Sequence, residues 1–240
     1  MVGLPKSTME IVRQALQAQV LRALGRSRAV VLAGPRQSGK STLSASLVPR
    51  GGARWFDLED PVDQQRLLQP MTAITALASA SGAPDAGPIV IDEVQLAPGL
   101  FPVLRVLTDR SAANGQFLLL GSASPALLRQ AGESLLGRVE VIEVGGFDIA
   151  EVGAARQTDL WLRGGYPRAF LAADDADSMA WRIQAIARHV ETDLPQFGVN
   201  VAAPAMLRCW RTATARSGMR PILRGRWGCP SPRCAGTSTC

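Results

Sequence analysis

The chain has 240 residues, enough for one α/β domain of ordinary size and part of a second unit. Apolar residues make up 47% of it and aromatic residues only 5%, which suits a core of Ala, Leu and Val and excludes a chain that is disordered throughout. No apolar run reaches the length of a signal peptide or of a membrane span, so we expect a cytoplasmic protein with no membrane partner.

The net charge of +6 arises at the end of the chain. Residues 1–193 carry 19 basic and 20 acidic side chains, whereas residues 194–240 carry seven arginines and no acidic residue. Such a tail binds nucleic acid through phosphate contacts or forms an unfolded end. All four cysteines lie in the same part of the chain, at spacings that do not match a zinc site: Cys209, Cys229, Cys234 and Cys240.

Short apolar runs alternate with segments of helical periodicity along residues 10–144. The runs predict strands at 29–33, 54–58, 89–91, 116–120 and 139–144. The periodic segments predict helices at 10–24, 41–47, 61–68, 72–80, 100–110 and 125–130, with Asp60 and Ser124 as N-caps. This alternation predicts an α/β fold, with a mainly parallel five-stranded sheet covered by helices on both faces. Beyond residue 146 the pattern becomes helical, at 179–190 and 203–211.

The sequence Gly-Pro-Arg-Gln-Ser-Gly-Lys-Ser at residues 34–41 fits the Walker A pattern and lies between a predicted strand and a predicted helix. Glycines let the backbone N–H groups turn toward a phosphate, Lys40 is placed to reach the β- and γ-phosphates, and Ser41 to bind Mg²⁺. Lysine occurs only twice in the chain, so its use here favours ATP binding over an incidental glycine-rich turn. The predicted nucleotide-binding residues are Gly34, Pro35, Arg36, Gln37, Ser38, Gly39, Lys40, Ser41 and Thr42.

Two acidic residues follow the apolar run 89–91, about fifty residues after the Walker A loop. The carboxyl ends of parallel strands form the edge where ligands bind, so the pattern predicts a Walker B strand. Asp92 is expected to hold Mg²⁺, and Glu93 to polarise the attacking water as a general base. Ser122 ends the next predicted strand and is a candidate contact of the γ-phosphate or the water. The alternative for Ser122 is a simple turn before the helix at 125–130.

In this order, six segments resemble a large prokaryotic family of AAA-superfamily ATPases. These segments are Gly-Pro-Arg-Gln-x-Gly-Lys-Ser, Asp-Leu-Glu-Asp, Ile-Asp-Glu-Val-Gln, Leu-Leu-Gly-Ser-Ala-Ser, Glu-Ser-Leu-Leu-Gly-Arg-Val and Gly-Gly-Tyr-Pro. The resemblance implies a P-loop NTPase sandwich with the AAA sheet order, followed by helical segments and a C-terminal domain of unknown function. It also implies ATP with Mg²⁺ and a site completed between or beside subunits. Arg138 matches the family's Gly-Arg and becomes the candidate charge-stabilising arginine, the alternative being a solvated side chain.

The resemblance covers roughly residues 13–210, after which the family pattern breaks. We expect an N-terminal helix at 1–27, an ATPase domain at 28–146, a helical segment at 147–211 and an aberrant disordered tail at 212–240, explained by a change of reading frame near Thr212. The predicted function is Mg²⁺-dependent ATP hydrolysis, with a homo-oligomer or an unknown protein as partner. The alternatives are a truncated nucleotide binder without turnover, a small-molecule P-loop kinase and a nucleic-acid-associated module.

Overall fold

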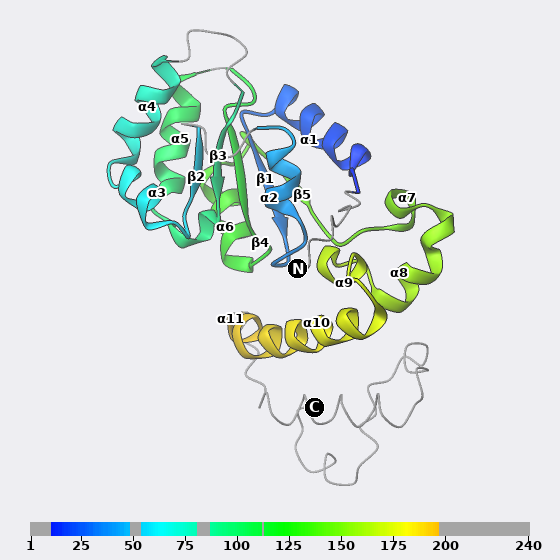
Figure 1. The fold of residues 1–240 in the computed structure, drawn as a ribbon. Helices are drawn as coiled ribbons and strands as arrows, with labels where there is room; N and C mark the ends of the chain where they lie inside the picture. Colours follow the sequence, from blue (N-terminus) through cyan, green and yellow to red (C-terminus); the bar gives the residue numbers. More distant parts are fainter. Residues whose placement is uncertain (1–10, 49–53, 81–86, 112, 197–240) are drawn as a thin grey trace, which may run out of the picture. The chain divides into compact units, whose positions relative to one another are not determined.

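The computed structural model describes residues 11–48, 54–80, 87–111 and 113–196 (Figure 1). The helix expected at 203–211, the basic tail and the four cysteines lie outside the described residues. The chain divides into two units, Met1–Met179 and Ala180–Cys240. Within the described ranges, every helix is too short or too polar to cross a membrane.

A five-stranded parallel sheet forms the centre of the first unit, in the order β2-β3-β4-β1-β5. The strands are β1 (Ala29–Gly34), β2 (Trp55–Asp57), β3 (Ile89–Asp92), β4 (Phe117–Ser122) and β5 (Val139–Glu143). The predicted α/β class and parallel sheet are confirmed. Strand β4 lies between β3 and β1, and its last residue, Ser122, pairs in register with Gly34. The carboxyl ends of the strands therefore bring the Walker A and Walker B segments to one edge.

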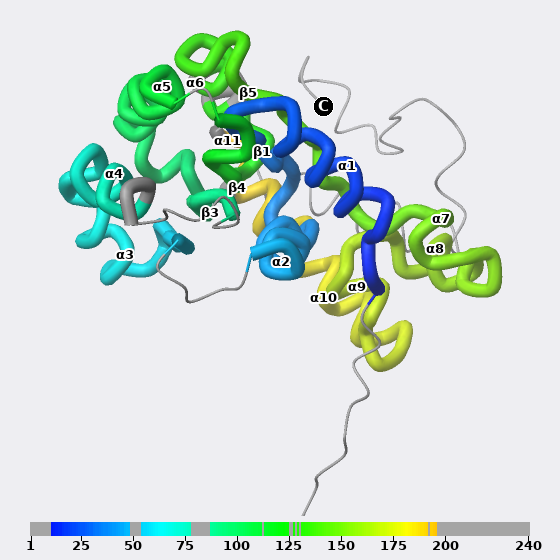
Figure 2. Tube along the Cα trace, turned by 90° about the horizontal axis from the view of Figure 1, so that it is seen from above, coloured from blue at the N-terminus to red at the C-terminus, as the bar shows by residue number. Residues whose placement is uncertain are grey.

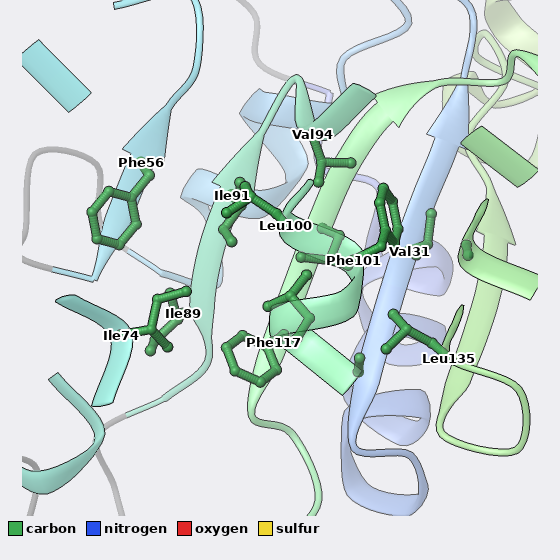
Figure 3. Packing of buried hydrophobic residues seen from close by; sticks show 14 of the residues in the cluster. Val31, Phe56, Ile74, Ile89, Ile91, Val94, Leu100, Phe101, Phe117 and Leu135 are labelled. Atoms are coloured by element: carbon green, nitrogen blue, oxygen red, sulfur yellow. The ribbon is translucent and has the colours of Figure 1, made fainter. Parts of the chain in front are cut away.

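Helices cover both faces of the sheet (Figures 1 and 2). Val31 and Ala33 of β1 face one core, whereas Val30 and Leu32 face the other, as the period-two alternation of a strand requires. The helices are α1 (Gln14–Arg26), α2 (Lys40–Ala45), α3 (Pro61–Arg66), α4 (Pro70–Ala80), α5 (Leu100–Arg110) and α6 (Pro125–Ser134). The first core, shown in Figure 3, contains side chains of α4, α5 and α6. The second core contains side chains of α1 and α2.

Both predicted helix caps are formed. The Asp60 carboxylate accepts a hydrogen bond from Val62 N at 2.8 Å, and the Ser124 hydroxyl accepts one from Leu127 N at 3.2 Å. Proline follows each cap at the first helical position, where its missing N–H costs nothing. Helix α5 has the predicted bounds, whereas α1 begins at Gln14 instead of at residue 10, which lies outside the described residues.

Several short helices follow the sheet, inside the helical segment expected at 147–211 but without predicted bounds of their own. They are α7 (Ile149–Val152), a 3₁₀ turn (Ala154–Arg156), α8 (Gln157–Arg163) and α9 (Pro167–Phe170). Helices of this length are too short to show a periodic pattern. The usable signal was local, because Asp148 and Glu151 form a capping box at the start of α7. Helix α10 (Asp175–Arg188) begins four residues before the predicted start at 179.

The described residues of the second unit begin within α10. A π-helical turn (His189–Asp193) follows, and then the short α11 (Leu194–Gln196). His189 Nδ1 lies 2.8 Å from Asp193 Oδ2 across the π-helical turn.

Candidate functional site

The Walker A segment connects β1 to α2, as its sequence predicts. Gly34 ends β1, and a Cβ atom at this position would lie 2.1 Å from the carbonyl oxygen of Val144, so only glycine fits here. The loop then passes through two left-handed residues, Gln37 with φ 64° and Gly39 with φ 92°, before α2 begins at Lys40. The Ser38 hydroxyl is buried and has no hydrogen-bond partner among the described residues.

The Lys40 side chain lies inside this loop. Its Nζ donates hydrogen bonds of 3.0 Å to the carbonyl oxygens of Gly34 and Pro35. Burial lowers the pKa of Lys40, while the negative charges of Glu93 and Asp92 oppose that shift. The ammonium group is therefore held by the loop backbone and within the electrostatic field of both predicted Walker B acids.

Asp92 ends β3, and its side chain is buried. Its carboxylate accepts a hydrogen bond of 3.0 Å from Glu93 N. Burial raises the pKa of Asp92, and the nearby Glu93 and Asp57 carboxylates add to the rise, whereas the nearby Ser41 hydroxyl and the Glu93 N–H lower it. The two residues predicted to bind Mg²⁺, Ser41 and Asp92, therefore lie near each other at this edge.

Asp57 is a further carboxylate at the same edge and was not predicted as a site residue. It ends β2 and pairs in register with Asp92 of β3. Its Oδ1 accepts a hydrogen bond of 2.9 Å from Glu59 N, which fixes the turn after the strand. The signal was present in the sequence, because Asp57 opens the Asp-Leu-Glu-Asp segment at the end of a predicted strand.

Ser122 and Glu93 are joined through a residue that the sequence analysis gave no role. Ser122 N donates to Gln95 Oε1 at 3.3 Å, and Gln95 Nε2 donates to Glu93 Oε2. Glu93 itself is left-handed, with φ 54°, an uncommon conformation for a residue other than glycine. Gln95 belongs to the Ile-Asp-Glu-Val-Gln segment, so its type and position were visible, but the contact depends on which strand lies beside β3.

Arg13, immediately before α1, donates hydrogen bonds both to the Walker A loop and to the chain that follows β5. Its Nη1 donates to Ser38 O at 3.3 Å and to Gly145 O at 3.0 Å, and its Nη2 donates to Gly146 O at 3.1 Å. Its Nε forms a 2.7 Å ion pair with Glu151 of the α7 capping box, and both side chains are about 10% exposed or less. No local pattern marks a lone arginine in this role, which explains why it was missed.

The Gly-Gly-Tyr-Pro segment lies beside the Walker A loop. Gly165 packs so closely on the chain after β5 that a Cβ atom would lie 2.4 Å from Phe147 O, and Phe147 N donates to Gly165 O at 2.6 Å. Pro167 Cγ comes to 3.7 Å from the position of a Cβ on Gly39. The segment therefore lies against the Walker A loop. The glycines in its sequence could not predict this contact.

Arg138 is not brought to this edge. It precedes β5 at the opposite, amino-terminal edge of the sheet, where its carbonyl accepts from Ala29 N at the start of β1. Its guanidinium forms two hydrogen bonds with the Asp109 carboxylate, of 2.5 and 3.0 Å. Within its own chain Arg138 is thus separated from Lys40 and Glu93 by the length of the strands. A role in charge stabilisation would have to be played toward a neighbouring subunit.

Comparison with known families identifies the domain that carries this site. Residues 26–153 match the model of a family described as an AAA domain, which covers more than half of the chain. The chain belongs to this AAA family. Membership of this family supports a nucleotide-binding function of the ATPase type. Residues 155–224 match a domain of unknown function, and this match extends beyond residue 211, where we expected the family pattern to break.

Two curated relatives are 47% identical to the chain over 204 residues, uncharacterized proteins of Mycobacterium bovis and Mycobacterium tuberculosis. The match covers 85% of this chain but 44% of each relative, so it spans less than half the length of these proteins. Among solved structures, a Walker-type ATPase of Pyrococcus abyssi is similar with 12% identity and a TM-score of 0.49, over 78% of this chain and 75% of that one.

Proposed function

We propose that this AAA domain binds ATP together with Mg²⁺ and hydrolyses it to ADP and phosphate at the carboxyl edge of its sheet. The observation that carries the proposal is the convergence at Asp92. Its buried carboxylate lies near the Ser41 hydroxyl of the Walker A loop, which lowers its pKa, and its charge acts on Lys40 of the same loop. The Lys40 ammonium, the Ser41 hydroxyl and the carboxylates of Asp92 and Glu93 therefore lie beside a loop that can enclose a phosphate.

The residues present fit a nucleotide with its metal ion. The Ser41 hydroxyl and the Asp92 carboxylate are oxygen ligands, the kind that Mg²⁺ prefers, and they already lie together. The raised pKa of Asp92 and the buried, unpartnered Ser38 hydroxyl indicate a site whose polar groups are not fully satisfied by the protein itself. A phosphate group brings acceptors for backbone N–H groups and for Lys40, and Mg²⁺ brings positive charge to Asp92.

Each residue takes a role that its position supports. Lys40 exchanges its hydrogen bonds to Gly34 and Pro35 for contacts with the β- and γ-phosphates, and its positive charge stabilises charge that develops there. Asp92 and Ser41 would hold the metal ion, which would supply positive charge next to the phosphates. Glu93 accepts a proton from the attacking water, which then adds to the γ-phosphorus as the bond to the ADP oxygen breaks. Ser122 orients the γ-phosphate or the water from β4.

ATP binding is the first test of the proposal. Calorimetric titration with ATP and Mg²⁺ should give a saturable isotherm for the wild type and none for Lys40→Ala over the same concentration range. The matched control is Lys6→Ala, because the chain has only one other lysine. We expect that control to bind as the wild type does. Removal of Mg²⁺ with EDTA should weaken ATP binding to the wild type but have little effect on Asp92→Asn.

The products separate ATP hydrolysis from the alternatives. Phosphate release by the wild type in the absence of any other acceptor supports hydrolysis. ADP production that requires an added acceptor would instead identify a kinase, and saturable binding without any ADP would identify a binder without turnover. Equal ATP affinity of wild type and Lys40→Ala would contradict the proposed site.

A further inference from the structure

Gln95 lies between the ends of two neighbouring strands and bonds to both. Its amide nitrogen donates to the Glu93 carboxylate after β3, and its amide oxygen accepts from Ser122 N at the end of β4 at 3.3 Å. A carboxamide is the neutral side chain that donates to a carboxylate and accepts from an N–H at the same time. No step of the proposed hydrolysis uses Gln95, so its two bonds require a separate explanation.

The backbone on both sides is shaped to admit this side chain. The left-handed conformation of Glu93 starts a 3₁₀ turn (Val94–Leu96), which brings Gln95 back toward the residue it contacts. On β4, a Cβ atom at Gly121 would lie 2.5 Å from Gln95 Oε1 and 2.7 Å from Leu127 Cδ2. Glycine at 121 therefore leaves the space that Gln95 occupies. An uncommon backbone conformation at Glu93 and a glycine at 121 both accommodate one contact, which indicates a functional constraint.

We infer that Gln95 is a positioning residue that couples the Glu93 carboxylate to the end of β4. A movement of the Ser122 backbone in response to the γ-phosphate is transmitted through the amide of Gln95 to the carboxylate of Glu93. The inference rests on the proposed ATP hydrolysis for its effect on rate, but the link between Glu93 and Ser122 is a property of the chain alone.

Steady-state kinetics separate this role from a merely structural one. Gln95→Met keeps the length of the side chain and loses both hydrogen bonds, so kcat should fall by about tenfold or more while KM for ATP changes less than about twofold. Gln95→Glu keeps the shape and the acceptor for Ser122 N but loses the donor to Glu93, so it should lose kcat to a similar extent. Adding Gln95→Met to Glu93→Gln should cause no further loss, because Gln95 acts through Glu93.

The matched control is Gln116→Met. Gln116 precedes the other end of β4, and its amide donates to Ser111 O and Ala113 O, away from the carboxyl edge. This control should keep the kcat of the wild type. Wild-type kcat in both Gln95 variants, or a rise in KM that accounts for the whole loss of kcat/KM, would overturn the inference.

The link can also be measured without turnover. In ¹⁵N-labelled protein, Glu93→Ala should shift the backbone amide resonance of Ser122, and this shift should disappear when Gln95→Met is also present. A shift of equal size in both backgrounds would overturn the inference, as would no shift in either. If the wild type released no phosphate, the proposed function would fail, but this measurement would still decide whether Gln95 couples the two residues.

Discussion

At the carboxyl edge of the sheet, burial raises the pKa of Asp92 and lowers that of Lys40. Around the amino edge, a hydrogen bond from Arg138 lowers the pKa of Asp109, and one from Arg26 lowers that of Glu140. The pKa of a carboxylate is thus raised at one edge of the sheet and lowered at the other. Charges at the amino edge are paired and exposed, whereas those at the carboxyl edge are buried and compensated only in part.

The difference indicates that the buried charges at the carboxyl edge lower the stability of the free protein. Exposed ion pairs contribute little and can be removed at small cost. Buried charges that lack full compensation cost stability in the free protein and are compensated when a ligand of the right charge binds. We therefore expect substitutions at the two edges to change the free energy of unfolding by different amounts and, for one pair of residues, in opposite directions.

The largest effect should come from filling the space at Gly34. Gly34→Ala places a Cβ atom 2.1 Å from a backbone carbonyl that cannot move without displacing the chain after β5. The free energy of unfolding should fall by about 3 kcal/mol, measured by urea denaturation. The control is Gly132→Ala in α6, where a Cβ meets nothing within 4 Å and should stabilise by roughly 0.5–1 kcal/mol. Equal stability of the two variants would contradict the close packing.

Removal of the Arg13 side chain should have an effect of similar size. Arg13→Met leaves Glu151 as an unpaired, largely buried carboxylate and frees the carbonyls of Ser38, Gly145 and Gly146. We expect the free energy of unfolding to fall by about 3 kcal/mol. The matched variant Arg26→Met breaks an exposed pair with Glu140 and should leave it nearly unchanged. Similar losses in both variants would remove the distinction between the edges.

Replacing a carboxylate by an amide should change the free energy of unfolding in opposite directions at Asp92 and at Asp109. Because the pKa of Asp92 is raised in the folded state, its ionised form costs stability, and the cost grows as pH rises from 3.8 through the folded pKa. Asp92→Asn should therefore stabilise the nucleotide-free protein at neutral pH, by about 1 kcal/mol, and should lose this advantage toward low pH. Urea denaturation between pH 4 and pH 7 measures both effects.

Asp109→Asn is the reference for this experiment. The pKa of Asp109 is lowered by Arg138, so its ionised form adds stability above pH 3.8 that is lost as pH falls through the folded pKa. This variant should be slightly less stable than the wild type at neutral pH. A decrease in stability on Asp92→Asn as well would show that the two edges do not differ in the way described.

The smallest effect on nucleotide binding should come from Arg138. Arg138→Gln breaks the pair with Asp109 at the far edge and should leave the ATP affinity of the monomer within about twofold of the wild type. Calorimetric titration of a monomeric sample measures this. A loss of affinity comparable to that of Lys40→Ala would place Arg138 in its own chain's site and contradict the geometry.

Local signals were sufficient to predict most of the sheet and the helices that cover it. A valine-rich run marked β1 and an isoleucine-rich run marked β3, and Asp60-Pro61 and Ser124-Pro125 marked two helix starts, because each depends on residues adjacent in sequence. The short helices α7 to α9 escaped notice for lack of length. Arg138 precedes a predicted strand, which puts it at the amino edge of a parallel sheet, but its ion pair with Asp109, 29 positions away, is not visible in the sequence.

For the candidate site, the sequence predicts residues where a motif implies the chemistry, and it does not predict contacts that are long-range. The Walker segments indicated Lys40, Ser41, Asp92 and Glu93 directly. Arg13 and Glu151 are 138 positions apart, and Gln95 and Ser122 are 27 apart, so neither pair is visible before the strand order is known. Pro167 reaches the loop for the same reason, through the close packing of Gly165 on Phe147.

The most direct test of ATP hydrolysis at the carboxyl edge is phosphate release by the wild type and by Glu93→Gln, with ATP affinity measured on the same samples. We expect turnover by the wild type, and a variant that binds ATP within about threefold of the wild type but releases phosphate at least about a hundredfold more slowly. A Glu93→Gln variant that turns over as fast as the wild type would contradict the assignment of Glu93 as the base.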